Sequence, residues 1–133
     1  MKVAQDSVRS AKDVVASHER FASAADLDGI MSNVADDAIV LVPNSALVKG
    51  KAAIREMYKT FLAQGRWEFV HDYEDAVSTG DVVVLHGVAR GTVVPSGGER
   101  SSFANNFLIV LRNQADGQFR FWRISFGPSV AEK

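Results

Sequence analysis

The 133-residue chain contains no cysteine and only three histidines, and each shortage excludes a class of site. Without cysteine there is no disulfide framework, thiolate zinc site, iron–sulfur cluster or thiol nucleophile. A histidine-rich metal site would need all three histidines at once. We therefore predict no metal centre and no cofactor.

The sequence also lacks an excess of either charge and a long apolar run. Fifteen Lys and Arg residues balance sixteen Asp and Glu residues, so the formal net charge is −1. This balance does not provide the broad basic surface that binds a phosphate backbone, and we expect no nucleic-acid partner. Residues 1–20 contain no continuous apolar stretch, which predicts neither a signal peptide nor a transmembrane helix. The expected compartment is the cytoplasm, with no membrane partner.

What the chain does contain favours one domain over residues 1–133. Hydrophobic residues make up 47% of it, and a chain of this length buries roughly two-thirds of its unfolded surface on folding. Residues 3–25 predict an amphipathic helix with His18 on its apolar face, because apolar side chains recur there every three or four residues. These positions are Val8, Ala11, Val15 and Ala22.

The rest of the first half predicts two more helices and a short strand. Asp26 is placed to cap a short second helix. Residues 38–42 read as a buried strand that ends at Pro43. Residues 50–63 predict a third helix, in which Ile54, Met57, Tyr58, Phe61 and Leu62 share the apolar face.

In the second half the hydrophobic period changes from the helical value to two. Four strands are expected, over residues 67–78, 82–94, 100–112 and 118–126, joined in series by hairpin turns. The element order predicts an α+β fold in which three helices pack on one face of a curved antiparallel sheet.

The strand around residue 106 is apolar on both of its faces. Helices can cover only one face of such a sheet, so the outer face is expected to meet a second copy of the chain in a homodimer. The alternative is that the terminal segments cover it.

Several segments resemble the nuclear-transport-factor-2-like superfamily, in particular its SnoaL-like and ketosteroid isomerase-like branch. They are residues 25–30, 34–39, 49–54, Pro43 and the turn at Asp116 and Gly117 before an aromatic last strand. The resemblance spans about residues 8–126 and implies a cone-shaped fold with a pocket between helices and sheet. These segments cap helices and form turns, so they are typical of the fold and not of one reaction.

The resemblance also implies positions for a site. Val42 stands where ketosteroid isomerases carry their catalytic aspartate, and valine cannot carry a proton, which argues against that mechanism. His18 takes the place of the tyrosine that binds the oxyanion, and Tyr58 that of the tyrosine supporting it; we predict that the two lie within hydrogen-bonding reach. Asn105 falls near the second oxyanion group, although Asn106 could face the pocket in its stead.

Each of these residues has a plainer structural interpretation. His18 and Tyr58 fit equally well as core side chains, and Asn105 as an amide that bonds to neighbouring strands. Phe126 shares a strand face with Trp122 and Ile124, so we expect these three to form one wall of the pocket. The full set of expected lining residues is Val42, Met57, Phe61, Phe103, Phe107, Trp122, Ile124 and Phe126.

The other two histidines receive no role from the sequence. Asp75 lies four residues from His71, which brings two side chains together on a helix but leaves them about 13 Å apart on a strand. A two-histidine site that combines a histidine of the sheet, His71 or His86, with His18 is conceivable, since scytalone-dehydratase-like members of the superfamily use histidines from the sheet. His86 reads as a surface or interface residue.

Two functions fit these observations. The first is a protein that binds a small apolar or carbonyl-bearing ligand, and whose enzymatic form would be a cofactor-free isomerase, cyclase or dehydratase. In it His18 would act as acid and base, Tyr58 would orient it and Asn105 would polarise an oxygen. The second is a non-catalytic ligand-sensing or dimeric association domain, which Val42 favours. The sequence leaves open whether the protein is an enzyme.

Overall fold

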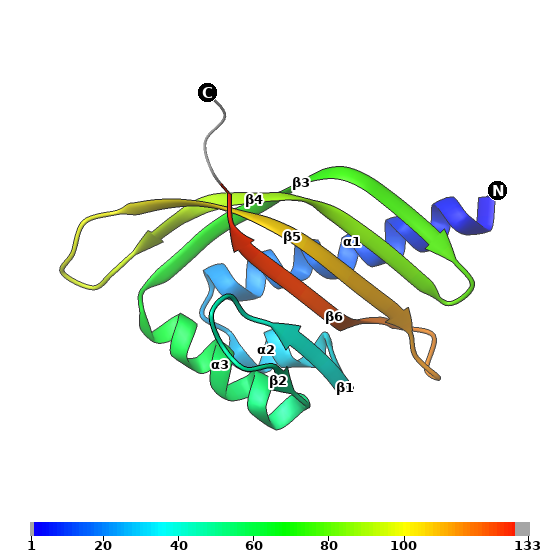
Figure 1. Cartoon of the computed structure of the whole chain (residues 1–133), viewed down its shortest axis with the longest axis horizontal. Coiled ribbons are helices and arrows are strands. Elements are labelled where there is room, and N and C mark those ends of the chain that lie inside the picture. The colour runs from blue at the N-terminus through cyan, green and yellow to red at the C-terminus, as the bar shows by residue number, and fades with distance from the viewer. Residues whose placement is uncertain (1, 130–133) are drawn as a thin grey trace.

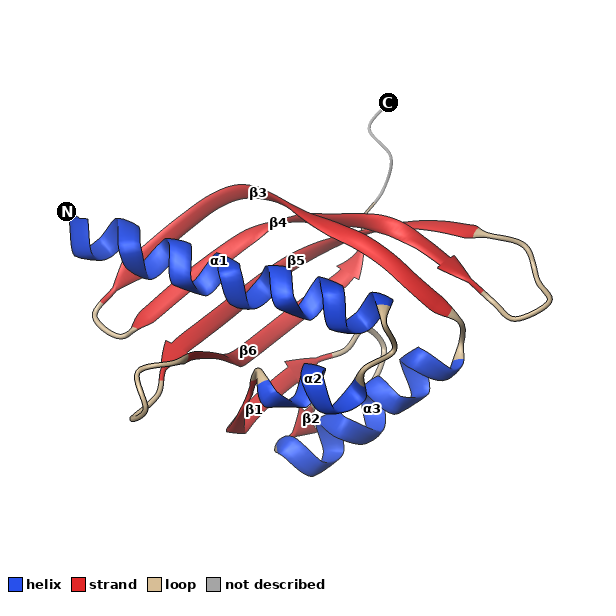
Figure 2. Cartoon of the chain, turned by 180° about the vertical axis from the view of Figure 1, so that it is seen from behind, coloured by secondary structure: helices blue, strands red, loops and turns tan. Residues whose placement is uncertain are grey.

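The computed structural model describes residues 2–129 and has three helices and six strands in that part of the chain. The helices are α1 (Lys2–Ser23), α2 (Leu27–Ser32) and α3 (Lys51–Ala63). The strands are β1 (Val34–Leu41), β2 (Val48–Lys49), β3 (Arg66–Thr79), β4 (Val82–Val94), β5 (Ser101–Asn113) and β6 (Phe119–Pro128). The α+β class is therefore confirmed, with the helices on one side of a curved sheet (Figure 2).

The sheet order is β2-β1-β6-β5-β4-β3, and the four long strands pair antiparallel as predicted (Figure 1). Two features differ from the prediction. Strand β1 pairs parallel with β6, so the sheet is mixed. The two-residue strand β2, which was not predicted, adds an edge beside β1.

Local sequence signals explain where the helices begin. The side chain of Asp26 accepts a hydrogen bond of 2.9 Å from the backbone N–H of Gly29, which confirms the predicted cap of α2. Helix α3 begins at Lys51 and not at Gly50, because Gly50 has a φ of 87°. That left-handed conformation favours glycine, and it lets the Gly50 N–H donate to the Ala38 carbonyl over 2.8 Å.

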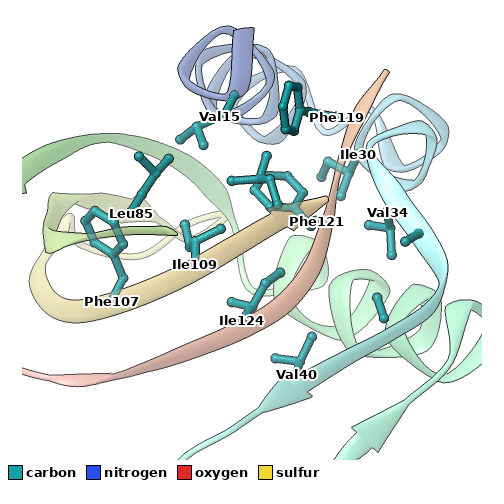
Figure 3. Packing of buried hydrophobic residues seen from close by; sticks show 14 of the residues in the cluster. Val15, Ile30, Val34, Val40, Leu85, Phe107, Ile109, Phe119, Phe121 and Ile124 are labelled. Atoms are coloured by element: carbon teal, nitrogen blue, oxygen red, sulfur yellow. The ribbon is translucent and has the colours of Figure 1, made fainter. Parts of the chain in front are cut away.

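The core lies between α1, α2 and the inner face of the sheet (Figure 3). Val15 of α1 and Ile30 of α2 are completely buried against strands β5 and β6, which contribute Leu111 and Phe121. On β5 the odd-numbered residues point inward, whereas Leu108 on the other face is 44% exposed. Pairing of two copies through this outer face stays a prediction.

Strand β6 contains an irregularity that reverses one prediction. Val110 pairs with Arg123 but its neighbour Leu111 pairs with Phe121, so Trp122 is an extra residue in a β-bulge. The Trp122 ring consequently lies outside the cone, 4.6 Å from the Arg112 guanidinium and 4.0 Å from that of Arg123. The prediction that Trp122 shares an inner wall with Ile124 and Phe126 is wrong.

Within residues 2–129, no helix combines the length and the apolar character that a bilayer-spanning segment needs.

Candidate functional site

A cavity of about 200 Å³ lies between α1, α3 and the inner face of strands β3 to β6. Most of its wall is aromatic or aliphatic. Three of the lining residues, Phe107, Ile109 and Ile124, are labelled in Figure 3, on neighbouring strands of the sheet. Its polar side chains come from four elements: His18 on α1, Tyr58 on α3, His71 on β3 and Asn105 on β5. The remaining lining residues are Ala22, Ile30, Phe61, Leu62, Trp67, Phe69, Ala89, Phe103, Phe107, Ile109, Phe121, Ile124 and Phe126.

His71 is held by a carboxylate from the helix above it. Its Nδ1 lies 2.7 Å from Glu19 Oε2, and the same oxygen accepts the His71 backbone N–H over 2.8 Å. The His71 side chain is only 7% exposed, and that of Glu19 21%. An ionised carboxylate accepts hydrogen bonds but cannot donate them, so Nδ1 is the protonated nitrogen when Glu19 is ionised. When the ring is neutral, the other nitrogen, Nε2, is an acceptor, and it makes no hydrogen bond with the residues that the structure describes.

His18, next to Glu19 in the chain, has a different environment. Its ring meets the rings of Tyr58, Phe69 and Phe121 edge-on, with centroids 5.5, 6.0 and 5.2 Å away. The His18 ring makes no hydrogen bond with any side chain or backbone group of residues 2–129, and its Nδ1 is fully enclosed. Burial, followed by the positive charge that His71 carries when it is protonated, lowers the pKa of His18 to about 3. His18 is therefore neutral near neutral pH.

The predicted hydrogen bond between His18 and Tyr58 is absent from the described part of the chain, although their rings are in contact. Both residues come from apolar helix faces that pack together, so the rings meet through their edges and not through their polar atoms. Burial raises the pKa of the Tyr58 hydroxyl, which also finds no partner in residues 2–129.

The structure distinguishes the two neighbouring amides of β5. Asn105 lines the cavity, whereas Asn106 is exposed on the opposite face, because successive side chains of a strand alternate. The Asn105 amide makes no hydrogen bond with other described residues. Asn105 therefore presents an unused donor and acceptor on the cavity side of the sheet.

Five of the eight expected lining residues lie on the cavity: Phe61, Phe103, Phe107, Ile124 and Phe126. Three do not. Trp122 is displaced by the bulge, Met57 packs against the core beside the cavity, and Val42 follows the end of β1. Val42 borders a separate hollow on the outer side with Pro43. A catalytic carboxylate at this position is thus missing, and Val42 itself does not line the cavity.

The sequence-based reasoning missed Glu19 entirely and left His71 without a partner. The two residues are 52 positions apart, so no local spacing connects them. The sequence places each residue near the site but does not connect the two. Glu19 follows His18 on the helix, and His71 falls on the inward register of its strand beside Phe69 and Tyr73.

Comparison with known proteins identifies the fold. The structure is similar to a ketosteroid isomerase-like protein from Erwinia carotovora atroseptica, with a TM-score of 0.82 and 17% identity over 93% of this chain and 97% of that one. It is also similar to an NTF2-like protein of unknown function from Pseudomonas putida (TM-score 0.77, 17% identity, 96% and 90% covered). A third is a candidate dehydratase of the NTF2-like family from Streptomyces avermitilis (TM-score 0.79, 14% identity, 96% and 99% covered).

At these identities the structural similarity shows the fold alone. No curated protein matches the sequence. The family model of the SnoaL-like domain, however, matches residues 14–122, which include every residue that lines the cavity except Ile124 and Phe126. The chain therefore belongs to the SnoaL-like family, within the NTF2-like superfamily.

Proposed function

We propose that the cavity binds a small apolar carbonyl compound and that the protein moves a proton at the carbon next to the carbonyl, without a cofactor. Isomerisation, cyclisation and dehydration of such compounds share this first step. The observation that carries the proposal is the Glu19–His71 pair, which brings a proton acceptor to the wall of a mostly apolar cavity. A titratable group in such a pocket is a candidate general base.

His71 acts as the base in this mechanism. Glu19 fixes the ring through Nδ1, so Nε2 takes the proton from the substrate carbon. The resulting imidazolium is stabilised by the carboxylate behind it, in the manner of a carboxylate–histidine pair in other enzymes. The base role thus moves from His18, the residue favoured by the sequence, to His71.

Negative charge develops on the carbonyl oxygen as the proton leaves. The Asn105 amide lies on the same inner face as His71 and donates a hydrogen bond to that oxygen without a change of its own protonation. His18 and Tyr58 are neutral groups that bind the rest of the ligand. A pKa of about 3 makes His18 too weak a base to remove the proton itself.

The proposal is tested by deuterium exchange with ketones that fit the cavity. Acetophenone, cyclohexenone and indanone are incubated with the protein in heavy water, and deuterium at the carbon next to the carbonyl is followed by NMR. The wild-type protein is expected to exchange it faster than buffer, and His71→Gln to lose about 100-fold or more of that rate.

His86→Gln is the matched control, because His86 lies on β4 with its side chain on the outer face. It should exchange at the wild-type rate. Ketones that bind without any catalysed exchange would overturn the proposal in favour of a non-catalytic ligand-binding role.

A further inference from the structure

Strand β4 presents only small residues to the middle of the cavity. Ala89 is directly paired with His71 on one side and Asn105 on the other, and it is 7% exposed. Two residues before and two residues after Ala89, the inward position of β4 is a glycine between two aromatic residues. Gly91 lies between Phe69 and Phe103, and Gly87 lies between Tyr73 and Phe107.

The two glycines cannot be enlarged. A side chain on Gly87 would collide with the backbone oxygen of Asp72, and one on Gly91 with that of Glu68. Glycine at such positions is typical where neighbouring strands approach closely in a bent sheet. Of these three inward positions of β4, Ala89 is therefore the one where a substitution can change the space between His71 and Asn105.

The register sets the width of that space. Adjacent strands are about 4.8 Å apart, so the backbones of His71 and Asn105 are separated by about 10 Å across Ala89. A methyl group between an imidazole and an amide leaves a gap into which a ligand atom fits. His18, which is 8% exposed, lines the same cavity and adds a neutral ring edge to its wall.

The cavity also limits the ligand in size and charge. A cavity of about 150 Å³ lined by aliphatic and aromatic side chains holds benzene, and this one is about 200 Å³. Of the described residues, none that lines it is an Asp, Glu, Lys or Arg. A charged ligand would be buried there without an ion-pair partner of its own, since Glu19 already pairs with His71.

We infer that Ala89 sets the size limit of the ligand, and that the ligand is a neutral single-ring carbonyl compound whose oxygen lies at Asn105 and whose neighbouring carbon lies at His71. This inference rests on the proposed function for the direction of the carbonyl. It adds the substrate class and the residue that selects it.

The test measures binding by calorimetry, which is independent of catalysis. Acetophenone is expected to bind the wild-type protein, and Ala89→Val to weaken that binding by about tenfold, because two added methyl groups fill the gap. Benzoate, which has a similar shape but a charge, should bind the wild-type protein at least about a hundredfold more weakly than acetophenone. The matched control is Ala104→Val, whose side chain lies on the outer face of β5 opposite Arg90; it should bind acetophenone like the wild type.

Unfolding curves verify that the variants fold. If Ala89→Val does not fold, Ala89→Ser serves as the second variant. The ratio of its affinity for the larger 2-acetylnaphthalene to its affinity for acetophenone should be lower than the same ratio in the wild type. Wild-type affinity of Ala89→Val for acetophenone, an unchanged size preference in Ala89→Ser, or tight binding of benzoate would overturn the inference. If the wild-type protein catalyses deuterium exchange but substitutions of Ala89 do not change ligand affinity, this inference alone would be overturned. If substitutions of Ala89 change ligand affinity as expected but the wild-type protein catalyses no deuterium exchange, only the proposed function would be overturned.

Discussion

The helix wall and the sheet wall of the cavity each carry a histidine, but only one of the two histidines has a carboxylate beside it. On the sheet wall, His71 Nδ1 is 2.7 Å from Glu19. On the helix wall, the His18 ring is surrounded by aromatic rings and forms no hydrogen bond with the described residues. The same imidazole is thus a supported proton acceptor in one wall and a neutral, weakly basic group in the other. A neighbouring charge, more than exposure, separates the two roles, since both rings are largely buried.

The largest effect is expected from removing the charge that distinguishes the walls. Glu19→Gln keeps an oxygen that can accept from His71 Nδ1, but it no longer stabilises the imidazolium. Catalysed deuterium exchange should fall by about 100-fold or more. Calorimetry should show acetophenone binding within about twofold of the wild type, since a positioning group for the base contributes to the rate and not to neutral ligand binding.

Glu56→Gln provides the control, because Glu56 is an exposed residue of α3. It should leave both measurements unchanged. If Glu19→Gln lowered binding and exchange equally, Glu19 would be serving the shape of the cavity, and the contrast between the two histidines would not explain the chemistry.

A medium effect is expected on the helix wall, in stability and not in rate. Burial lowers the pKa of His18 from 6.5 to about 3. Between these values the unfolded chain binds a proton that the folded chain does not, so stability falls as the pH falls through this window. From about pH 7 to about pH 5, the wild-type protein should lose about 2 kcal/mol more unfolding free energy than His18→Leu, in which this proton is absent.

Urea unfolding at the two pH values measures the difference, and carboxylates common to both proteins cancel. His86→Gln should lose as much stability as the wild type does, because His18 is retained there. Equal pH dependence of wild type and His18→Leu would mean that His18 is protonated in the folded protein, and the two walls would then be alike.

The same comparison shows what could be predicted from the sequence. The helical stripe correctly placed His18 on an inward face, because a period of three to four residues is set by one helix alone. The strand alternation likewise placed Phe103 and Phe107 inward. Trp122 was misplaced because a β-bulge shifts the alternation by one residue, and this shift depends on how β6 pairs with β5.

The Glu19–His71 pair was beyond local reasoning for a related cause. It forms where α1 crosses β3, so it depends on the packing of two elements that are far apart in the chain. The resemblance to ketosteroid isomerases directed attention to Val42, the position of the family's usual base. The structure has a carboxylate elsewhere, on the helix, and it reaches the cavity only through His71.

The smallest effect is expected from the second polar group of the helix wall. Tyr58→Phe removes a hydroxyl that has no partner within residues 2–129 and keeps the ring that packs on His18 and Phe61. If the hydroxyl binds the ligand, acetophenone affinity should fall by about three- to tenfold, the value of one neutral hydrogen bond.

Tyr73→Phe is the matched control, since Tyr73 lies under the Lys12 ammonium and not on the cavity. Because the proton transfer is assigned to the sheet wall, the exchange rate at saturating ketone should stay the same in Tyr58→Phe. A fall in that rate with unchanged affinity would assign Tyr58 to the reacting oxygen, and the chemistry would then span both walls.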